Sequence, residues 1–561
     1  MANYKISMRI PLTSWIIFSA ICIFLCLSFL GIHQIGLTTD ECVFVNAAIS
    51  GGRDDYIYIK FFNFPFMTFF YEGALKAWLY YPIFKLFGVS VLSIRIPAIM
   101  LAAVAIFVWY KSSQYLFKNN AYSLLFLLFM ATDPAFIHHT NIEFNTVALH
   151  SLLIAITFYF YLRFIATQSP HVLAWLFAFL ILGIFNRFNF IWVAFGLLVT
   201  GLLFDYRAVW SAYKKNAKAT LLYALLFFVT MVLMTIFFLI PASAYPVGGS
   251  ILSTLSRYRV YYMANLYWYT MAGDLPYMTL FGKTIPYLGL KNVIEIGITL
   301  LALCGGILAS IRHVNNQEFS ILKKYQLFFL VLCLIIFAVM VITPPARMSY
   351  HMLTLWPLPQ LLFLLSVAML ACFMNRKVRL CFFLFCGASI LALQLLANYQ
   401  FLQTLNDEST QINPNWTLAI YKLTDYVNEN AKNYDEIATM SFGTTMQLIA
   451  LANDDAIRNK LHEEVWALLL REPHWKTIRN LFNPGFNQDD ATNRKWLYDN
   501  IFKHKKVLLI DSVLINRDTE AVDFPAFASD YHLSTSYLGR INDKHDQPIY
   551  YLYLVQDTAD H

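Results

Sequence analysis

The chain has 561 residues, of which 58% are hydrophobic and only 13% are charged, and its mean hydropathy is +0.53. Soluble domains carry roughly 25% charged residues, so this composition indicates that lipid is the main solvent of the chain. The net charge of +7 is small and its positive residues are spread over short loops, which argues against a nucleic-acid partner.

Eleven apolar runs in the first 400 residues are candidate membrane spans, because a helix needs about 20 apolar residues to cross a bilayer. They cover residues 15–36, 92–110, 121–138, 146–166, 171–186, 190–204, 219–240, 291–311, 325–343, 351–373 and 380–400. The run at 171–186 is short, so it and the next run could form one broken hairpin with Asn186 and Arg187 at its tip. The first run is too long for a cleaved signal, and no small-residue cleavage site follows it. The fold class expected for residues 1–400 is a multi-pass α-helical bundle.

Basic residues predict the orientation of the spans, because cytoplasmic loops are enriched in Lys and Arg. A cytoplasmic N-terminus places these residues inside: Lys5, Arg9, Lys111, Lys118, Arg163, Arg207, Lys214, Lys215, Lys218, Arg312, Lys323, Lys324, Arg376, Lys377 and Arg379. The short outer turns 132–146, 186–190 and 344–350 then hold only Arg187 and Arg347. An odd number of spans also places loops 37–91 and 241–290 outside, together with the C-terminal region.

The two long outer loops mix charges with many aromatic residues. Loop 37–91 contains Lys85, and loop 241–290 contains Arg257 and Arg259. This pattern predicts amphipathic segments that lie in the membrane interface rather than crossing it. For each charge taken singly, a side chain that reaches from the interface to water is the better explanation.

Residues 401–561 are rich in Asn, Asp, Lys and His, and we expect them to form a separate extracytoplasmic α/β domain. The expected helices are Trp416–Asn428, several within 444–481, and 490–502; the expected strands are Glu436–Phe442, Lys506–Asp511, Tyr531–Leu538 and Pro548–Val555. The eight cysteines form no CxxC pair and no zinc-ligand spacing, so the sequence predicts no metal site of that kind.

An acidic pair, Asp40-Glu41, follows the first span almost at once. Two acids beside apolar chains are costly unless they bind or react with something. They could equally be acids in the first turn of a solvated helix that Thr39 or Asp40 caps. The residues alone leave these two interpretations equally open.

Two further outer segments carry polar residues. The turn 132–146 holds Glu143, which acts either in a site or as an acid that stabilises a helix N-terminus, and the adjacent His138 and His139, which do not suit a metal pair. Arg347, Tyr350 and His351 open the tenth run, and a helix starting near Arg347 would place Arg347 and His351 on one face. A cation and an imidazole at headgroup level suit a phosphate, whether of a substrate or of an ordinary membrane lipid.

The order of several short motifs resembles the GT-C membrane glycosyltransferases, in the branch that includes protein O-mannosyltransferases and lipid A aminoarabinose transferases. The motifs are Asp40-Glu41, Tyr80-Tyr81-Pro82, 84–88, Arg95-Ile96-Pro97-Ala98, Ala131-Thr132-Asp133-Pro134, Ile142-Glu143-Phe144-Asn145, and Ser349-Tyr350-His351 before Leu355-Trp356-Pro357. The likeness covers roughly residues 30–200 and 340–370. It departs from the family in having fewer spans than many relatives, and in Glu143 where many relatives have Asp.

This resemblance implies transfer of a sugar from a polyprenyl-phosphate donor to a lipid, glycan or protein acceptor at the outer face, with inversion. The implied general base is Asp40, with Glu41 orienting Asp40 or the acceptor, and Glu143 binding the acceptor or the sugar. The implied phosphate ligands are Arg347 and His351, near Tyr350, with one of Lys85, Arg257 or Arg259. The expected location is a bacterial inner membrane. No cofactor is required, although paired acids can bind a divalent cation.

A transporter or flippase for a lipid-linked or anionic solute is the main alternative, and a non-catalytic assembly or sensor protein is another. A transporter predicts acids near the middle of spans and helices broken by Gly or Pro. The acids here are expected at the outer ends of mostly uninterrupted spans, which favours the transferase.

Overall fold

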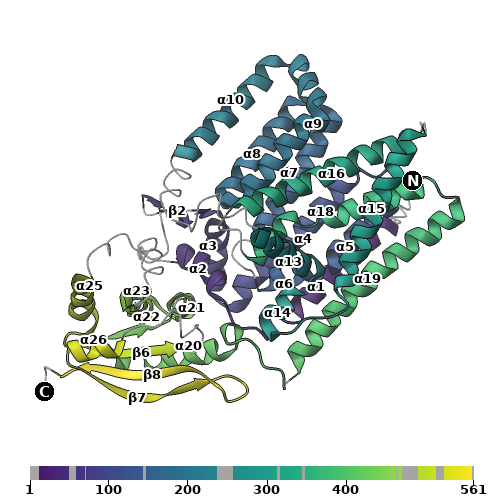
Figure 1. Ribbon diagram of the computed structural model, residues 1–561. Coiled ribbons are helices and arrows are strands. Elements are labelled where there is room, and N and C mark those ends of the chain that lie inside the picture. The colour runs from purple at the N-terminus through teal and green to yellow at the C-terminus, as the bar shows by residue number, and fades with distance from the viewer. Residues whose placement is uncertain are drawn as a thin grey trace, which may run out of the picture.

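A computed structural model describes residues 12–558 of the chain, apart from residues 50–58, 63, 70, 143–146, 237–256, 313–315, 344–347, 408, 442, 463, 470–489 and 513–523. Most of the first 406 residues are helical, and a five-stranded sheet with its own helices follows (Figure 1). The expected fold class, a helical membrane bundle with a C-terminal α/β region, is therefore confirmed.

An apolar helix lies in each of the eleven expected ranges, but the helices are not equally long. Eight are long and apolar enough to cross a membrane: α1 (Leu12–Phe29), α4 (Val91–Ser113), α7 (Val147–Thr167), α9 (Ile191–Lys215), α10 (Ala217–Met234), α15 (Gly289–Ile311), α16 (Gln317–Ile342) and α19 (Arg376–Asn406). The pair α5 (Asn120–Thr132) and α6 (Pro134–Asn141) bends by 45° and would count as a ninth span. Two shorter apolar helices are α8 (Pro170–Asn186) and α18 (Leu358–Ala371). The chain is an integral membrane protein.

Prolines explain why two of the expected spans are interrupted. Asp133 precedes Pro134 and has an extended backbone, as residues before proline prefer, so α5 ends there and α6 starts in a new direction. In the run 351–373, Pro357 separates α17 (Ser349–Met352) and a short 3-10 turn (Leu353–Leu355) from α18. Both breaks leave polar side chains inside the bundle.

The loop expected at 37–91 contains more regular structure than interfacial segments alone. It forms α2 (Thr39–Ile49), an antiparallel sheet of β1 (Ile59–Phe61), β2 (Phe64–Phe69) and β3 (Glu72–Gly73), and α3 (Leu75–Phe87). Phe61, Phe62 and Phe64 expose their rings, as suits a segment at the membrane interface. In loop 241–290, the described elements are α13 (Arg257–Ala272) and α14 (Leu275–Phe281).

The C-terminal region is a mixed sheet with strand order β5-β4-β6-β8-β7. β4 pairs in parallel with β5 and β6, whereas β8 pairs antiparallel with β6 and β7. The strands are β4 (Glu436–Thr439), β5 (Leu461–His462), β6 (Lys506–Ser512), β7 (Leu533–Asn542) and β8 (Pro548–Asp557). The α-helices are α20 (Ala419–Asn430), α21 (Thr444–Leu451), α22 (Asp455–Asn459), α23 (Glu464–Leu469), α25 (Asp490–Leu497) and α26 (Phe524–Asp530). The strands lie where the sequence predicted them, except that β5 was not expected.

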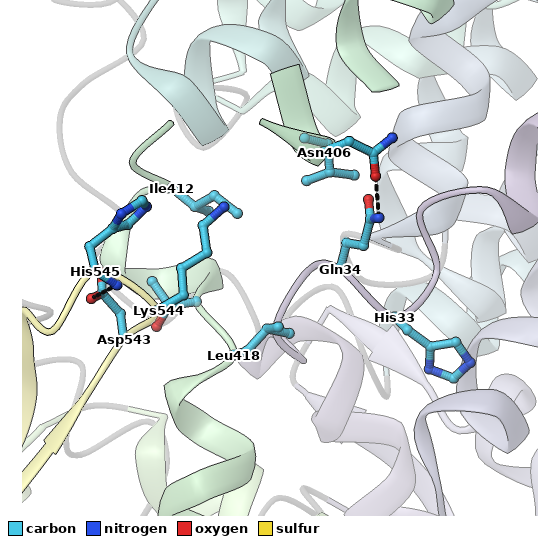
Figure 2. A pocket seen from close by; sticks show the side chains of 10 residues that line it. His33, Gln34, Asn406, Ile412, Leu418, Asp543, Lys544 and His545 are labelled. Atoms are coloured by element: carbon cyan, nitrogen blue, oxygen red, sulfur yellow. Dashed lines mark hydrogen bonds between the residues drawn. The ribbon is translucent and has the colours of Figure 1, made fainter. Parts of the chain in front are cut away.

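The C-terminal domain sits against one end of the bundle, beside α2 and α3 (Figure 1). The turns joining α9 to α10 and α18 to α19 lie at the far end. A pocket of about 340 Å³ marks one edge of the junction. Figure 2 shows Lys544 and His545 of the β7–β8 loop on one side of this pocket and the hydrogen-bonded pair Gln34 and Asn406 on the other.

Candidate functional site

The acidic pair opens α2, and the helix cap there is Thr38 rather than Thr39 or Asp40. The Thr38 hydroxyl accepts a hydrogen bond from the Glu41 backbone N–H at 3.4 Å, and the Thr38 N–H donates to a Glu41 carboxylate oxygen at 2.8 Å. This reciprocal arrangement is a capping box, which satisfies two N–H groups that the first helical turn leaves free. The cap therefore fixes where α2 starts and which way its first side chains point.

Glu41 is fully buried and its carboxylate is occupied by Arg95 of α4. Arg95 donates from Nε and Nη2 to the two Glu41 oxygens at 2.7 and 2.9 Å. The remaining donors of Arg95 bind the backbone carbonyls of Ile32, Ile35 and Gly36, which follow α1. Removing one member of such a pair leaves an uncompensated buried charge. Glu41 is placed to position α2 and its neighbour Asp40, and no Glu41 surface is open to an acceptor.

Asp40 is only partly buried, and it differs from Glu41 in its partners. Among the described residues, none donates a hydrogen bond to the Asp40 carboxylate; its neighbours act through charge. Burial raises the pKa of the Asp40 carboxyl above its ordinary value, the charge of Glu41 raises it further, and the nearby cations Arg187 and Lys76 lower it. A carboxylate with a raised pKa is a stronger proton acceptor than an ordinary aspartate.

The main cation near Asp40 is Arg187, which lies between α8 and α9. Its guanidinium carbon lies 4.6 Å from the centroid of the Tyr350 ring, and its Nε lies 4.0 Å from a Glu72 carboxylate oxygen. Arg187 is 2% exposed and Glu72 is fully buried. The Phe188 N–H donates to the Tyr71 carbonyl at 3.0 Å, which ties this turn to the small sheet. The structure thus brings together segments of the chain that are more than a hundred residues apart.

His351 lies beside Tyr350 at the same end of the bundle. Its ring centroid lies 4.5 Å from that of Tyr350 and 5.7 Å from that of Trp192. Burial lowers the pKa of the His351 imidazole well below its ordinary value, and the charge of Arg187 lowers it further, so the ring is neutral near pH 7. Its Nδ1 accepts a hydrogen bond from the Met348 N–H at 3.3 Å, so the proton resides on Nε2, which can donate. We call Asp40, Glu72, Arg187, Tyr350 and His351 the α2 site.

A second group of polar side chains lies inside the bundle, at the break between α5 and α6. Asp133 accepts hydrogen bonds from the Phe136 N–H at 3.1 Å, Lys291 at 3.2 Å and Gln394 at 3.1 Å, and also from Gln360. Lys291 also lies 3.7 Å from a Glu295 oxygen. We call Asp133, Lys291, Glu295, Gln360 and Gln394 the bundle cluster. All five are buried, and the Asp133 carboxylate already has four donors.

The chain is similar to known proteins in part of its sequence and in its fold. Residues 72–234 match the family described as dolichyl-phosphate-mannose-protein mannosyltransferase. A crystal structure of ArnT from Cupriavidus metallidurans bound to undecaprenyl phosphate superposes with a TM-score of 0.59 at 14% identity, covering 97% of this chain and 98% of that one. The apo form of the same protein gives a TM-score of 0.58 at 12% identity, with the same coverage. No curated protein sequence matches the chain.

The fold is that of ArnT. The resemblance predicted from the short motifs is therefore confirmed at the level of the fold, along both chains almost from end to end. In this fold, Asp40, Tyr350 and His351 lie near Arg187, which the sequence placed at an outer turn but not in a site.

The remaining expected site residues are placed differently. Lys85 is exposed near the end of α3, with its ammonium 5.7 Å from the Tyr81 ring centroid. Arg259 donates to the backbone carbonyls of Val341 and Thr343 at 3.3 and 2.9 Å, so it caps the end of α16. Glu143, Arg347 and the side chain of Arg257 lie outside the described residues.

Two buried charges near Asp40 were not predicted as site residues. Glu72 pairs with Arg187, and the ammonium of Lys76 lies over the rings of Phe44 and Tyr80, at 4.7 and 5.2 Å from their centroids. Both residues belong to loop 37–91, where several charged residues stand among aromatic ones. Their sequence context therefore does not distinguish them from the other charges of this loop. Arg187 had a stronger signal, because it is the single charge in a short turn between two apolar runs. Within the described part of the chain, no group of three His, Cys, Asp or Glu residues is placed to hold a metal ion.

Proposed function

We propose that the protein transfers a sugar from a polyprenyl-phosphate donor to a hydroxyl group of a lipid, glycan or protein acceptor at the outer face of the membrane. The observation that carries this proposal is the α2 site. A partly exposed carboxylate with a raised pKa stands near a buried arginine, at the end of a bundle with the GT-C fold. The fold is shared with a protein that binds undecaprenyl phosphate, which supports a polyprenyl phosphate as the carrier.

The chemistry needs a proton acceptor and a cation on opposite sides of the reacting sugar carbon. In the proposed step, the acceptor hydroxyl oxygen forms a bond to the anomeric carbon while Asp40 takes its proton. The bond from that carbon to the phosphate oxygen breaks, and its electron pair leaves with the lipid phosphate. Attack opposite the leaving phosphate inverts the anomeric configuration.

Arg187 is the described cation best placed to stabilise the departing phosphate, and the Nε2–H of His351 is a second donor. Arg347 and Arg257 stay predicted phosphate ligands, and Glu143 stays a predicted acceptor or sugar ligand. Glu41 acts in this scheme by holding Asp40, because its own oxygens are bound to Arg95. No step requires a metal ion.

The proposed side of the membrane rests on charge. Lys214 and Lys215 end α9, and Arg376, Lys377 and Arg379 lie in the first turn of α19, next to turns at the far end of the bundle, away from the C-terminal domain. Because basic turns favour the cytoplasm, the C-terminal domain and the α2 site are assigned to the outer face. A bacterial inner membrane remains the expected location.

A transporter is the alternative, and the break at Pro134 is the kind of feature it would use. At this break, however, Asp133 already has four donors, and Lys291 binds Asp133 and the Met271 carbonyl. Asp133 therefore offers little to a transported ligand, whereas the partly exposed carboxylate of Asp40 in the α2 site can bind or react with one. The transferase is therefore the better proposal.

The deciding experiment reconstitutes the purified protein with polyprenyl-phosphate sugars and a panel of lipid, glycan and peptide acceptors, and follows products by mass spectrometry. We expect equal amounts of glycosylated acceptor and free polyprenyl phosphate. An intact donor that merely changes leaflet would favour the transporter. A donor split only by water would indicate a hydrolase, and no change of any donor would contradict the transferase.

A further inference from the structure

The helix that carries Asp40 packs with the C-terminal domain rather than with the core of the membrane bundle. The bundle core consists of side chains from α1, α4, α5, α7 and the later membrane helices, and it contains no residue of α2. Phe44 and Val45 of α2 lie instead in a hydrophobic core shared with α3 and with residues of α20 and α21, such as Leu423 and Met446. The proposed base and the proposed cation therefore belong to two differently packed parts of the protein.

Hydrogen bonds join the C-terminal domain to residues on both sides of the Asp40 turn. Gln447 of α21 donates from its side-chain amide to the Leu37 carbonyl at 2.6 Å, three residues before Asp40. Asn46, near the other end of α2, donates to the Met446 carbonyl at 3.3 Å. The Gly36 N–H donates to the Trp416 carbonyl at 2.7 Å. These bonds attach the residues before α2 and a residue near its end to the C-terminal domain.

Two glycines allow this close approach, one on each side of the junction. A Cβ atom added to Gly443 would lie 2.2 Å from the Thr39 hydroxyl oxygen, and Gly443 also has a positive φ of 83°. A Cβ atom added to Gly36 would lie 2.2 Å from the Thr417 carbonyl oxygen. Contacts this short are not tolerated without displacement of the backbone or of Thr39, the residue directly before Asp40.

We infer that the C-terminal domain holds the Asp40 turn in its reactive position, with Gln447 and Gly443 as positioning residues for the transfer reaction. This inference rests on the proposed function. Arg187 acts on Asp40 through its charge and is held by Tyr350 of α17 and Glu72 of β3, so the distance between base and cation depends in part on how α21 holds α2. Misplacing a reacting group by about 1 Å can lower a rate about 100-fold.

The first test measures how firmly α2 is held, without reference to activity. Hydrogen–deuterium exchange of the full-length protein in nanodiscs compares wild type with Gln447→Leu, Gly443→Ala and a control, Lys544→Ala. The control removes a cation from the pocket at the junction edge, where Lys544 contacts the Asp407 carbonyl and not α2. We expect faster exchange in residues 39–49 in the first two variants only. Unchanged exchange of α2 in both would overturn the inference.

The second test measures the consequence for transfer. We expect Gln447→Leu and Gly443→Ala to lower kcat by about 10-fold to 100-fold while KM for the lipid donor changes less than twofold, because the groups that bind the donor are untouched. Lys544→Ala should stay within twofold of wild type. Wild-type kcat in both positioning variants would contradict the inference, whereas absence of transfer in the wild type would contradict the proposed function instead.

A rescue separates positioning of Asp40 from strain within the C-terminal domain. Thr39→Gly removes the three Thr39 atoms that an added Cβ at residue 443 would meet. If the clash with Thr39 is the cause, Gly443→Ala should lower kcat much less in the Thr39→Gly background than in wild type. An equally large loss in both backgrounds would mean that the strain of a positive φ at residue 443 is responsible, and the positioning role of Gly443 would be wrong.

Discussion

The α2 site and the bundle cluster both contain buried acids beside a cation, but they differ in how completely the acids are satisfied. In the bundle cluster, Asp133 accepts four hydrogen bonds and its charge is matched by Lys291. In the α2 site, Asp40 is partly exposed, and no described residue donates a hydrogen bond to it. A saturated acid stabilises the fold, whereas an unsaturated one near a buried cation is available for a reaction. The two regions should therefore respond to mutation in opposite ways.

The largest effect on stability is expected in the bundle cluster. Lys291→Met leaves Asp133 and Glu295 without their cation inside the bundle, and removing one partner of a buried pair costs about 3–5 kcal/mol. Thermal or denaturant unfolding in detergent checks this loss. If Lys291→Met unfolds like the wild type, the bundle cluster does not stabilise the fold, and the difference drawn between the two regions is wrong.

The next effect concerns Glu41. It is the neighbour of Asp40 in the sequence, but like Asp133 of the bundle cluster it is buried and paired with a cation. Glu41→Gln removes the charge that pairs with Arg95, so we expect a loss of stability of about 3 kcal/mol. The conservative change Asp425→Asn, at an exposed acid of the C-terminal domain, should leave stability within about 0.5 kcal/mol of wild type. Equal stability of both variants would show that the Glu41–Arg95 pair contributes little.

Arg187→Gln should lower transfer, and it should also lower stability because it leaves the buried Glu72 without its cation. Loss of a cation that stabilises a leaving phosphate is expected to lower kcat about 100-fold, which corresponds to about 2.7 kcal/mol. Arg207→Gln, at an exposed arginine in the last part of α9, is the matched control and should leave kcat unchanged. A normal kcat for Arg187→Gln would indicate that Arg347 or Arg257, rather than Arg187, binds the phosphate.

The smallest expected effect is a shift of the pH profile. Wild-type transfer should fall as the pH decreases through the raised pKa of Asp40, because the protonated carboxyl cannot accept a proton. Arg187 lowers the pKa of Asp40, so Arg187→Gln should raise that pKa and move the acidic limb of kcat to higher pH. The profile of residual activity against pH measures this. A shift to lower pH would mean that the titrating group is not Asp40.

The bundle was predictable from sequence because an apolar run long enough to cross lipid has few structures open to it. The strands and helices of the C-terminal domain were predictable from the local pattern of apolar and polar residues, and Asp40 was singled out because an acid beside apolar chains needs an explanation. The helix cap was expected at Thr39 or Asp40 and lies at Thr38, since Thr38 and Thr39 are chemically equal and only the contact with Glu41 distinguishes them.

The rest of the site depends on contacts that no local pattern reveals. Arg187 meets Tyr350 across 163 positions of the chain, and Gln447 reaches Leu37 across 410. The family resemblance implied Arg259 as one of three alternative phosphate ligands, yet its guanidinium donates to the carbonyl groups at the end of α16. A charge near the membrane surface can cap a helix or bind a ligand equally well, and only the packing decides between them.

The most direct test of the central claim is the single-turnover rate of sugar transfer by Asp40→Asn, measured beside wild type and Asp425→Asn. Asparagine keeps the shape of Asp40 but cannot accept the proton, so we expect a rate at least about 100-fold below wild type, with unchanged unfolding and unchanged binding of the lipid donor. A rate for Asp40→Asn equal to that of wild type would contradict the account, because the unsaturated carboxylate of the α2 site would then not be the base.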